Sequence, residues 1–176
     1  MTMHPDELNS RREELRQYWQ GSNGWRAKYA IEMVPLPYVA SGDVLGGRLI
    51  RAGGDGRLRR VAERFGHAFR LELRFDCPPY SAKAPGGQEV YLINAERVMM
   101  QSPVACGAVG FHPGENELRW IWLHPFERGR NQIDDVWFRL ELLYGSDFTL
   151  DLPVSPAMQS FLRRKGVDPA RWGGGS

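Results

Sequence analysis

The stretch Leu118-Arg-Trp-Ile-Trp-Leu-His-Pro-Phe-Glu-Arg-Gly-Arg-Asn-Gln-Ile133 decides the fold, because it predicts a strand that turns sharply into a helix. Residues 118–123 are mostly aromatic or aliphatic, which is typical of a buried strand. His124-Pro125 ends this strand, since proline cannot donate a hydrogen bond to a sheet. The chain then becomes basic at Arg128-Gly129-Arg130 before the helix begins.

The helix after the basic turn is predicted by the spacing of its apolar residues. These recur three or four positions apart and stop before Gly145: Ile133, Val136, Trp137, Leu140, Leu143 and Tyr144. The first N–H groups of a helix lack partners, and this end carries about half a positive charge. A strand, a basic turn and a helix N-terminus therefore predict an anion site, with phosphate as the expected ligand.

The residues before this stretch predict a run of antiparallel strands. Residues 89–94 and 104–111 have the apolar pattern of strands. Residues 112–116 predict a turn that leads into the strand at 118–123. Strands joined by short turns are usually neighbours in a sheet.

The residues after the helix predict one more strand and one more helix. The strand is expected at 148–152 and the helix at 155–165, with Ser155 as its N-cap and Gly166 at its end. The two strands on either side of the 133–144 helix are expected to be parallel. The chain therefore predicts an α+β fold with a mixed, mostly antiparallel central sheet flanked by helices.

The first half of the chain is less regular. Residues 6–20 predict a modest helix. The glycine-rich segment at 41–56 predicts a loop with a short hairpin at 44–50. Residues 58–69 have helical spacing, while the alternation at 69–75 leaves two alternatives open, a longer helix or a strand. Residues 77–87 predict an irregular loop rich in proline and glycine, of the kind that often carries function.

A strand ending in His-Pro, an Arg-Gly-Arg turn, an amphipathic helix, a second strand and a Ser-Pro-Ala-Met helix follow one another within residues 88–166. This order resembles the core of the GNAT superfamily of N-acetyltransferases, whose signature is Arg/Gln-x-x-Gly-x-Gly/Ala. Arg128 matches the first position of the signature, whereas Asn131 and Ile133 stand at its two glycine positions. The resemblance implies a single GNAT-like domain over residues 1–172, with a divergent N-terminal part at 1–56.

The resemblance implies transfer of an acetyl group from acetyl-CoA to an amine of an unidentified acceptor, without a metal. In the family, backbone amides of the signature turn hold the pyrophosphate of the cofactor. A main-chain N–H group of the preceding strand polarises the thioester carbonyl. Carried over to this chain, the cofactor-binding residues are Trp122, Leu123, Arg128, Gly129, Arg130, Asn131, Gln132 and Ile133.

Catalytic groups are less clearly marked. The position that holds a general-acid tyrosine in many GNAT enzymes falls near Leu162, which cannot protonate a leaving group. Ser155 lies near a frequent asparagine of the family and is a candidate for contact with the cofactor thiol, or is only a helix cap. Glu72 and Asp76 are candidate bases if the 77–87 loop borders the acceptor site, or are inert surface carboxylates.

Two features favour the alternative that the fold has lost its cofactor. Side chains at Asn131 and Ile133 obstruct the close backbone approach that glycine permits. Asp134 and Asp135 offset the helix dipole and would repel a pyrophosphate.

On this alternative, the chain is a catalytically degenerate binding protein for an acidic protein or a nucleic acid. The contact surface would be the basic segment Arg48–Arg74, together with the 77–87 loop. This segment holds eight arginines against three acidic residues. A solvated helix face is the other interpretation of the same arginines.

Composition is that of an ordinary globular protein. The chain has 176 residues, of which 42% are hydrophobic and 25% charged, enough for one core and short for two domains. It has no apolar run of the ~18–20 residues that a membrane span needs and no signal-peptide core, so we expect a cytoplasmic protein without membrane contact. Cys77 and Cys106 are expected to be buried thiols, and no spacing indicates a metal site. Residues 173–176, Gly-Gly-Gly-Ser, are typical of an added linker.

Overall fold

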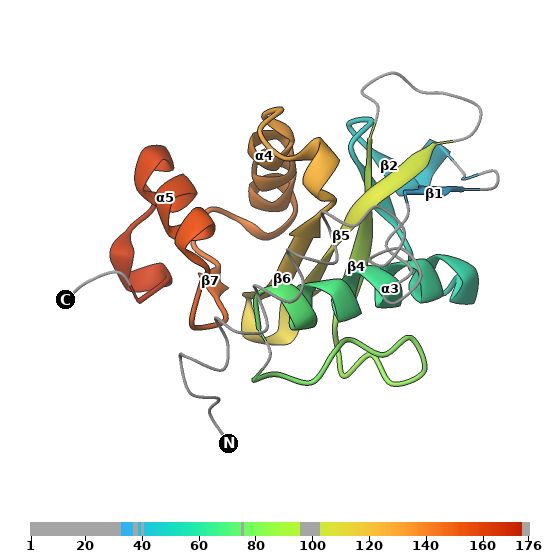
Figure 1. Ribbon diagram of the computed structural model, residues 1–176, viewed down its shortest axis with the longest axis horizontal. Coiled ribbons are helices and arrows are strands. Elements are labelled where there is room, and N and C mark those ends of the chain that lie inside the picture. The colour runs from blue at the N-terminus through green and yellow to red at the C-terminus, as the bar shows by residue number, and fades with distance from the viewer. Residues whose placement is uncertain (1–32, 37–38, 40, 75, 96–102, 174–176) are drawn as a thin grey trace, which may run out of the picture.

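The computed structural model describes residues 33–36, 39, 41–74, 76–95 and 103–173. The helix expected at residues 6–20 lies outside these ranges, as does most of the expected linker. Within them, a seven-stranded sheet has the order β2-β3-β4-β5-β6-β7, and β1 pairs with β5. The described residues also form three α-helices, α3, α4 and α5, around this sheet (Figure 1).

All neighbouring strands are antiparallel except β6 and β7, which are parallel, as predicted. The strands are β1 (Val34–Pro35), β2 (Val44–Leu45), β3 (Leu49–Arg51), β4 (Glu89–Asn94), β5 (Val104–His112), β6 (Glu117–Leu123) and β7 (Thr149–Leu150). The helices are α3 (Gly56–Glu72), α4 (Gln132–Tyr144) and α5 (Pro156–Lys165). The prediction of a mostly antiparallel sheet flanked by helices is confirmed.

The strand, turn and helix predicted from the opening stretch form β6 and α4, and the ends of the helices follow local rules. The N–H group of Gly145 donates to the carbonyl of Glu141 and ends α4. The hydroxyl of Ser155 accepts a hydrogen bond from the N–H group of Met158 and caps α5. Gly166 ends α5 in the left-handed conformation that glycine adopts readily. The predicted strand at 148–152 is shorter than expected and contains only β7.

Helix α3 decides between the two alternatives at residues 69–75, because it continues to Glu72. The carboxylate of Asp55 caps its start by accepting a hydrogen bond of 2.8 Å from the N–H group of Arg57. Its buried residues keep helical spacing: Leu58, Ala62, Phe65, Gly66 and Ala68. The burial of these residues does not alternate as in a strand, because residues 69–73 are all half-buried. The following residues, 77–87, form turns without a helix or strand, as predicted.

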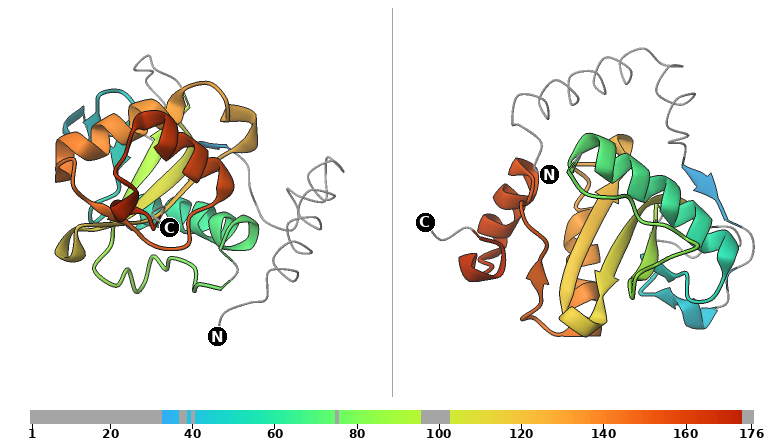
Figure 2. Two further views of the ribbon diagram at one scale, coloured as in Figure 1. Left: turned by 90° about the vertical axis from the view of Figure 1, so that its left-hand side faces the viewer. Right: turned by 90° about the horizontal axis from the view of Figure 1, so that it is seen from below.

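The two faces of the sheet carry different helices, so that the fold has three layers (Figure 2). Val90 and Leu92 of β4 face α3, because they belong to the hydrophobic cluster around Phe65. Tyr91 and Ile93 alternate with them and belong to the cluster of α4 and α5. This alternation separates a core under α3 from a core under α4 and α5.

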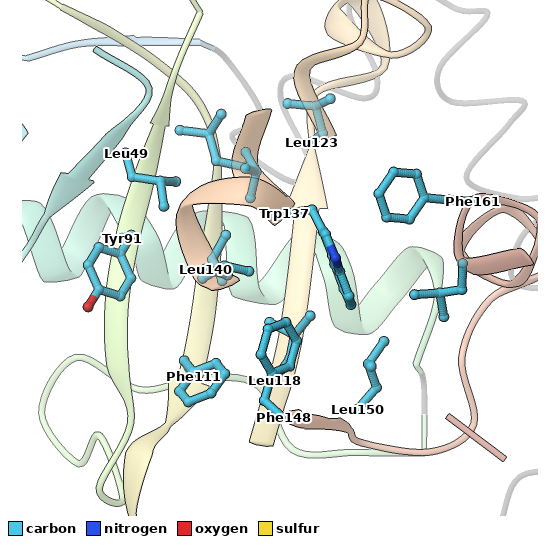
Figure 3. Packing of buried hydrophobic residues seen from close by; sticks show 14 of the residues in the cluster. Leu49, Tyr91, Phe111, Leu118, Leu123, Trp137, Leu140, Phe148, Leu150 and Phe161 are labelled. Atoms are coloured by element: carbon cyan, nitrogen blue, oxygen red, sulfur yellow. The ribbon is translucent and has the colours of Figure 1, made fainter. Parts of the chain in front are cut away.

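Tryptophans fill both cores. Figure 3 shows Trp137 of α4 beside Phe148 and Phe161, with ring centroids 4.9 Å and 5.6 Å away. On the other face, Trp122 of β6 stacks on Phe65 of α3 at 5.6 Å. Trp137 thus links α4 to α5, and Trp122 links β6 to α3.

The two cysteines differ in burial. Cys106 of β5 is fully buried, whereas Cys77 is half-buried in the loop after α3. The expectation of two buried thiols is therefore confirmed for Cys106 only.

Gly107 provides a test of the packing between β5 and β6. A Cβ atom at this position would lie 2.2 Å from the backbone oxygen of Trp122. We expect Gly107→Ala to lower the free energy of unfolding by about 1–3 kcal/mol, as overpacking does, in urea denaturation. Gly54→Ala is the matched control, since no atom lies within 4 Å of its Cβ position. Equal losses in the two variants would contradict this packing.

Candidate functional site

A cleft lies where β6 and β7 separate. The two parallel strands pair only through Glu117 with Thr149 and Leu118 with Leu150. Strand β6 continues to Leu123, whereas the chain after Leu150 turns away toward α5. The space between them is a cleft of about 370 Å³, bounded by β6, the turn before α4, and α5.

Most of the predicted cofactor-binding residues line this cleft: Trp122, Leu123, Arg128, Gly129, Asn131, Gln132 and Ile133. Ser155 lies on the α5 wall of the same cleft. Arg130 is the exception, because its side chain is 68% exposed and pairs with Glu127 at 3.8 Å. The fold therefore gathers the predicted residues, apart from Arg130, around one hollow.

The turn before α4 has an unusual backbone. Gly129 and Asn131 have left-handed φ angles of 80° and 59°, and asparagine is one of the few non-glycine residues that adopt this conformation readily. Asn131 is the N-cap of α4 but makes no side-chain cap hydrogen bond. In the part of the chain that the structure describes, no acceptor is found for the N–H groups of Gln132, Ile133 and Asp134. The start of α4 therefore presents unpartnered donors at the cleft.

Arg128 ties three elements together. Its Nε donates to the carbonyl of Leu123 at 2.8 Å, and its two terminal nitrogens lie 2.5 Å and 2.8 Å from the carboxylate oxygens of Glu72. The same carboxylate accepts a hydrogen bond of 2.7 Å from the indole of Trp122. The guanidinium also lies over the Trp122 ring, 5.6 Å from its centroid. Arg128 therefore joins the end of β6 to the last turn of α3.

The acidic residues at the start of α4 are paired with cations from other elements. Asp134 lies 2.9 Å from the ammonium of Lys165 and 3.4 Å from the guanidinium of Arg164, both in α5. Asp135 lies 3.3 Å from the buried guanidinium of Arg48. These partners offset the negative charge that we expected to repel a pyrophosphate.

Beneath the turn lies a buried polar group that the sequence did not indicate. The side chain of Gln132 points inward, where it accepts from the thiol of Cys106 at 3.5 Å and donates to Glu127. Burial, together with the charge of Glu127, raises the pKa of Cys106 to about 12. Cys106 therefore stays a protonated thiol, and only the backbone of Gln132 can serve a ligand in the cleft.

The three candidate catalytic residues have different surroundings. Ser155 caps α5 through its oxygen, which leaves its hydroxyl proton available to the cleft. Glu72 does not line the cleft but contacts Trp122 and Arg128, which do. Asp76 lies outside the cleft and pairs with Arg74 at 3.0 Å. Only Ser155 is placed in direct contact with the hollow.

Two further cavities continue from the cleft to the α3 face of the sheet. A small cavity of about 50 Å³, mostly apolar, shares Leu73, Ile121, Ser155 and Met158 with the cleft. A polar cavity of about 320 Å³ shares Phe69, Arg119, Trp120 and Asp151 with the small one. Residues 77–80 of the proline-rich loop line the polar cavity. The three hollows therefore adjoin one another around the open end of the β6–β7 pair.

Comparisons with known protein families, curated proteins and solved structures find no match to this chain. The resemblance to the GNAT superfamily therefore remains a prediction from the sequence. Among the described residues, no group of three or more histidine, cysteine or acidic side chains is placed to hold a metal ion. Within the same ranges, no helix has the length and apolar character needed to cross a membrane.

The Glu72–Arg128 pair can be tested by a double-mutant cycle with Glu72→Gln and Arg128→Gln. Both side chains are partly exposed, by 19% and 40%, so we expect a coupling free energy of only about 0.5–1 kcal/mol in urea denaturation. The coupling should shrink at about 1 M salt, because solvent-exposed charges are screened. Additive effects at low salt would show that this pair does not hold β6 to α3.

Proposed function

We propose that this chain is an N-acetyltransferase that binds acetyl-CoA in the cleft between β6 and β7. The observation that carries the proposal is the start of α4, where N–H groups that find no acceptor among the described residues border a cleft at the open end of two parallel strands. An anion binds well at such a helix terminus. The cofactor would supply an acetyl group activated as a thioester.

The residues present fit a pyrophosphate at this turn. The N–H groups of Gln132, Ile133 and Asp134 are available as donors, and the left-handed Asn131 keeps the turn open without glycine. Arg164 lines the opposite wall, where its guanidinium lies 3.4 Å from Asp134 and would be shared between that carboxylate and a bound anion. The side chain of Ile133 also lines the cleft, so that it limits how closely a ligand approaches the backbone.

Arg128 would contribute to the proposed site by releasing Glu72 and binding the pyrophosphate instead. Its guanidinium is held by Glu72, and a pyrophosphate would have to compete with that carboxylate. Arginine binds carboxylate and phosphate oxygens with the same fork of donors, so either partner satisfies it. Glu72 is therefore expected to act as a competitor of the cofactor, in place of the base that we considered from the sequence.

An amine acceptor would approach from the side of the sheet that α3 covers, through the polar cavity that residues 77–80 line. Ser155 borders both the cleft and the small cavity, which places its hydroxyl at the junction of the two approaches. There its proton is available to a developing negative charge on sulfur or oxygen. The carboxylate of Asp76 is committed to Arg74, so we do not assign it a role.

Calorimetry with acetyl-CoA tests the proposed cofactor site. We expect micromolar binding, about 8 kcal/mol, that Arg128→Glu weakens at least tenfold. Glu72→Gln should instead tighten binding several-fold, because it removes the competing carboxylate. Arg163→Glu makes the same charge change at an exposed position of α5 that does not line the cleft, and should leave affinity almost unchanged. An absence of binding at millimolar acetyl-CoA would overturn the proposal.

Two substitutions separate the structural role of Ser155 from its proposed chemical role. Ser155→Ala removes the helix cap and should lower the free energy of unfolding by about 1 kcal/mol, whereas Ser155→Asp keeps a capping acceptor and should change it little. Neither variant can donate the hydroxyl proton, so both should slow the release of free CoA thiol with a panel of amines. Full activity of Ser155→Asp would show that the residue is only a cap.

A further inference from the structure

The structure divides the eight arginines between residues 48 and 74 into two groups. Five of them make internal contacts that hold the fold together. Arg48 pairs with Asp135, Arg51 lies over Tyr91, Arg59 donates to Gly53, Arg70 donates to Cys77, and Arg74 pairs with Asp76. The remaining three, Arg57, Arg60 and Arg64, are exposed on α3. The basic segment predicted from the sequence is therefore a much smaller surface.

The three exposed arginines form a single row along the outer face of α3. Together with the exposed His67 they stand three or four residues apart, which places all four side chains on one side of the helix. Ten residues of α-helix rise about 15 Å, which is the length of the row. The buried residues of α3 face the opposite way, toward the sheet. We call this surface the arginine row.

The arginine row is unfavourable for the isolated helix. Arginines spaced three or four residues apart on a helix repel one another. Arg57 and Arg60 also lie near the positive end of the helix dipole, where cations are disfavoured. The carboxylate of Asp55 lies 3.6 Å from the guanidinium of Arg57 and offsets the unfavourable charge there. Within the described ranges, no carboxylate pairs with Arg60 or Arg64. Glu63, the neighbouring acidic residue of α3, is half-buried and accepts a hydrogen bond from the N–H group of Ala82, so in the described structure it forms no ion pair with the row.

The chemistry of the row identifies the kind of partner. The large hydrophobic side chains that are exposed among the described residues are Phe138, Leu142 and Leu152, and none of these lies on α3. A protein partner would need an apolar centre at its interface, and a membrane partner would need an apolar residue to insert. A chain of phosphates needs only cations, and arginine forms paired hydrogen bonds to phosphate oxygens.

We propose that the arginine row binds the phosphodiester backbone of a nucleic acid without reading its sequence, through Arg57, Arg60 and Arg64. Contacts to phosphates alone give affinity and orientation but no base specificity. Helix α3, which carries the row, lies on the face of the sheet opposite α4 and α5, as Figure 2 shows. The proposal is therefore independent of acetyl-CoA binding, and either can fail without the other.

Fluorescence anisotropy with the full chain tests the proposal. The probes are a mixed-sequence RNA strand and a mixed-sequence DNA duplex of about 20 nucleotides or base pairs, titrated between about 50 and 200 mM salt. Three phosphate contacts predict a slope of log affinity against log salt of about −2.7 on the duplex and about −2 on the single strand. The probe that binds with the higher affinity identifies which form of nucleic acid the row prefers.

Charge reversal locates the binding surface. Arg60→Glu combined with Arg64→Glu should weaken binding at least tenfold and reduce the salt slope by about two units. Arg139→Glu combined with Arg163→Glu has the same charge change on α4 and α5, and should keep the slope and most of the affinity. Circular dichroism checks that both double variants are folded.

Three results would overturn the proposal. The first is an absence of nucleic-acid binding at ~50 mM salt. The second is an equal loss of affinity in both double variants, which would indicate a response to net charge alone. The third is binding of a polyglutamate peptide or of vesicles containing phosphatidylserine, lost in the Arg60/Arg64 variant, without nucleic-acid binding.

Discussion

The separation of β6 from β7 is the constraint on which the rest of this structure depends. The two strands are parallel and therefore need a crossover, which α4 supplies. Because only two residue pairs join them, no strand among the described residues lies on the outer side of the carboxyl end of β6. The cleft, the exposed start of α4 and the adjoining cavities all follow from that gap. Ligands of α/β sheets commonly bind at such openings, beyond the carboxyl ends of strands.

Local sequence rules predicted the elements around this gap but not the contacts that set its chemistry. The spacing of apolar residues in α4, the cap at Ser155 and the stop at Gly166 each depend on a few neighbouring residues, so they could be predicted. The pair of Glu72 with Arg128 joins residues 56 positions apart in the chain, and neither residue marks its partner. The inward direction of Gln132, at the start of α4, likewise depends on Cys106 in strand β5.

Arginine has two opposite roles in this fold. Arg48 and Arg74 are almost fully buried and satisfy carbonyl and carboxylate oxygens between separate elements. Arg57, Arg60 and Arg64 reach solvent from one helix. Net charge over a segment cannot distinguish these roles, because the planar guanidinium suits both a buried fork of hydrogen bonds and an exposed phosphate. Burial, which comes only with the fold, makes the distinction.

The short length of β2 and β7 has a consequence for solubility. These two strands are the two ends of the sheet order, and each contains only two residues. An edge strand offers unpaired backbone groups to any other chain, and a long flat edge promotes pairing between molecules. At β2 and β7 themselves, the edge presents too little backbone to extend the ladder into a second copy. The same brevity that opens the cleft beside β7 therefore also limits edge-to-edge pairing at β2 and at β7.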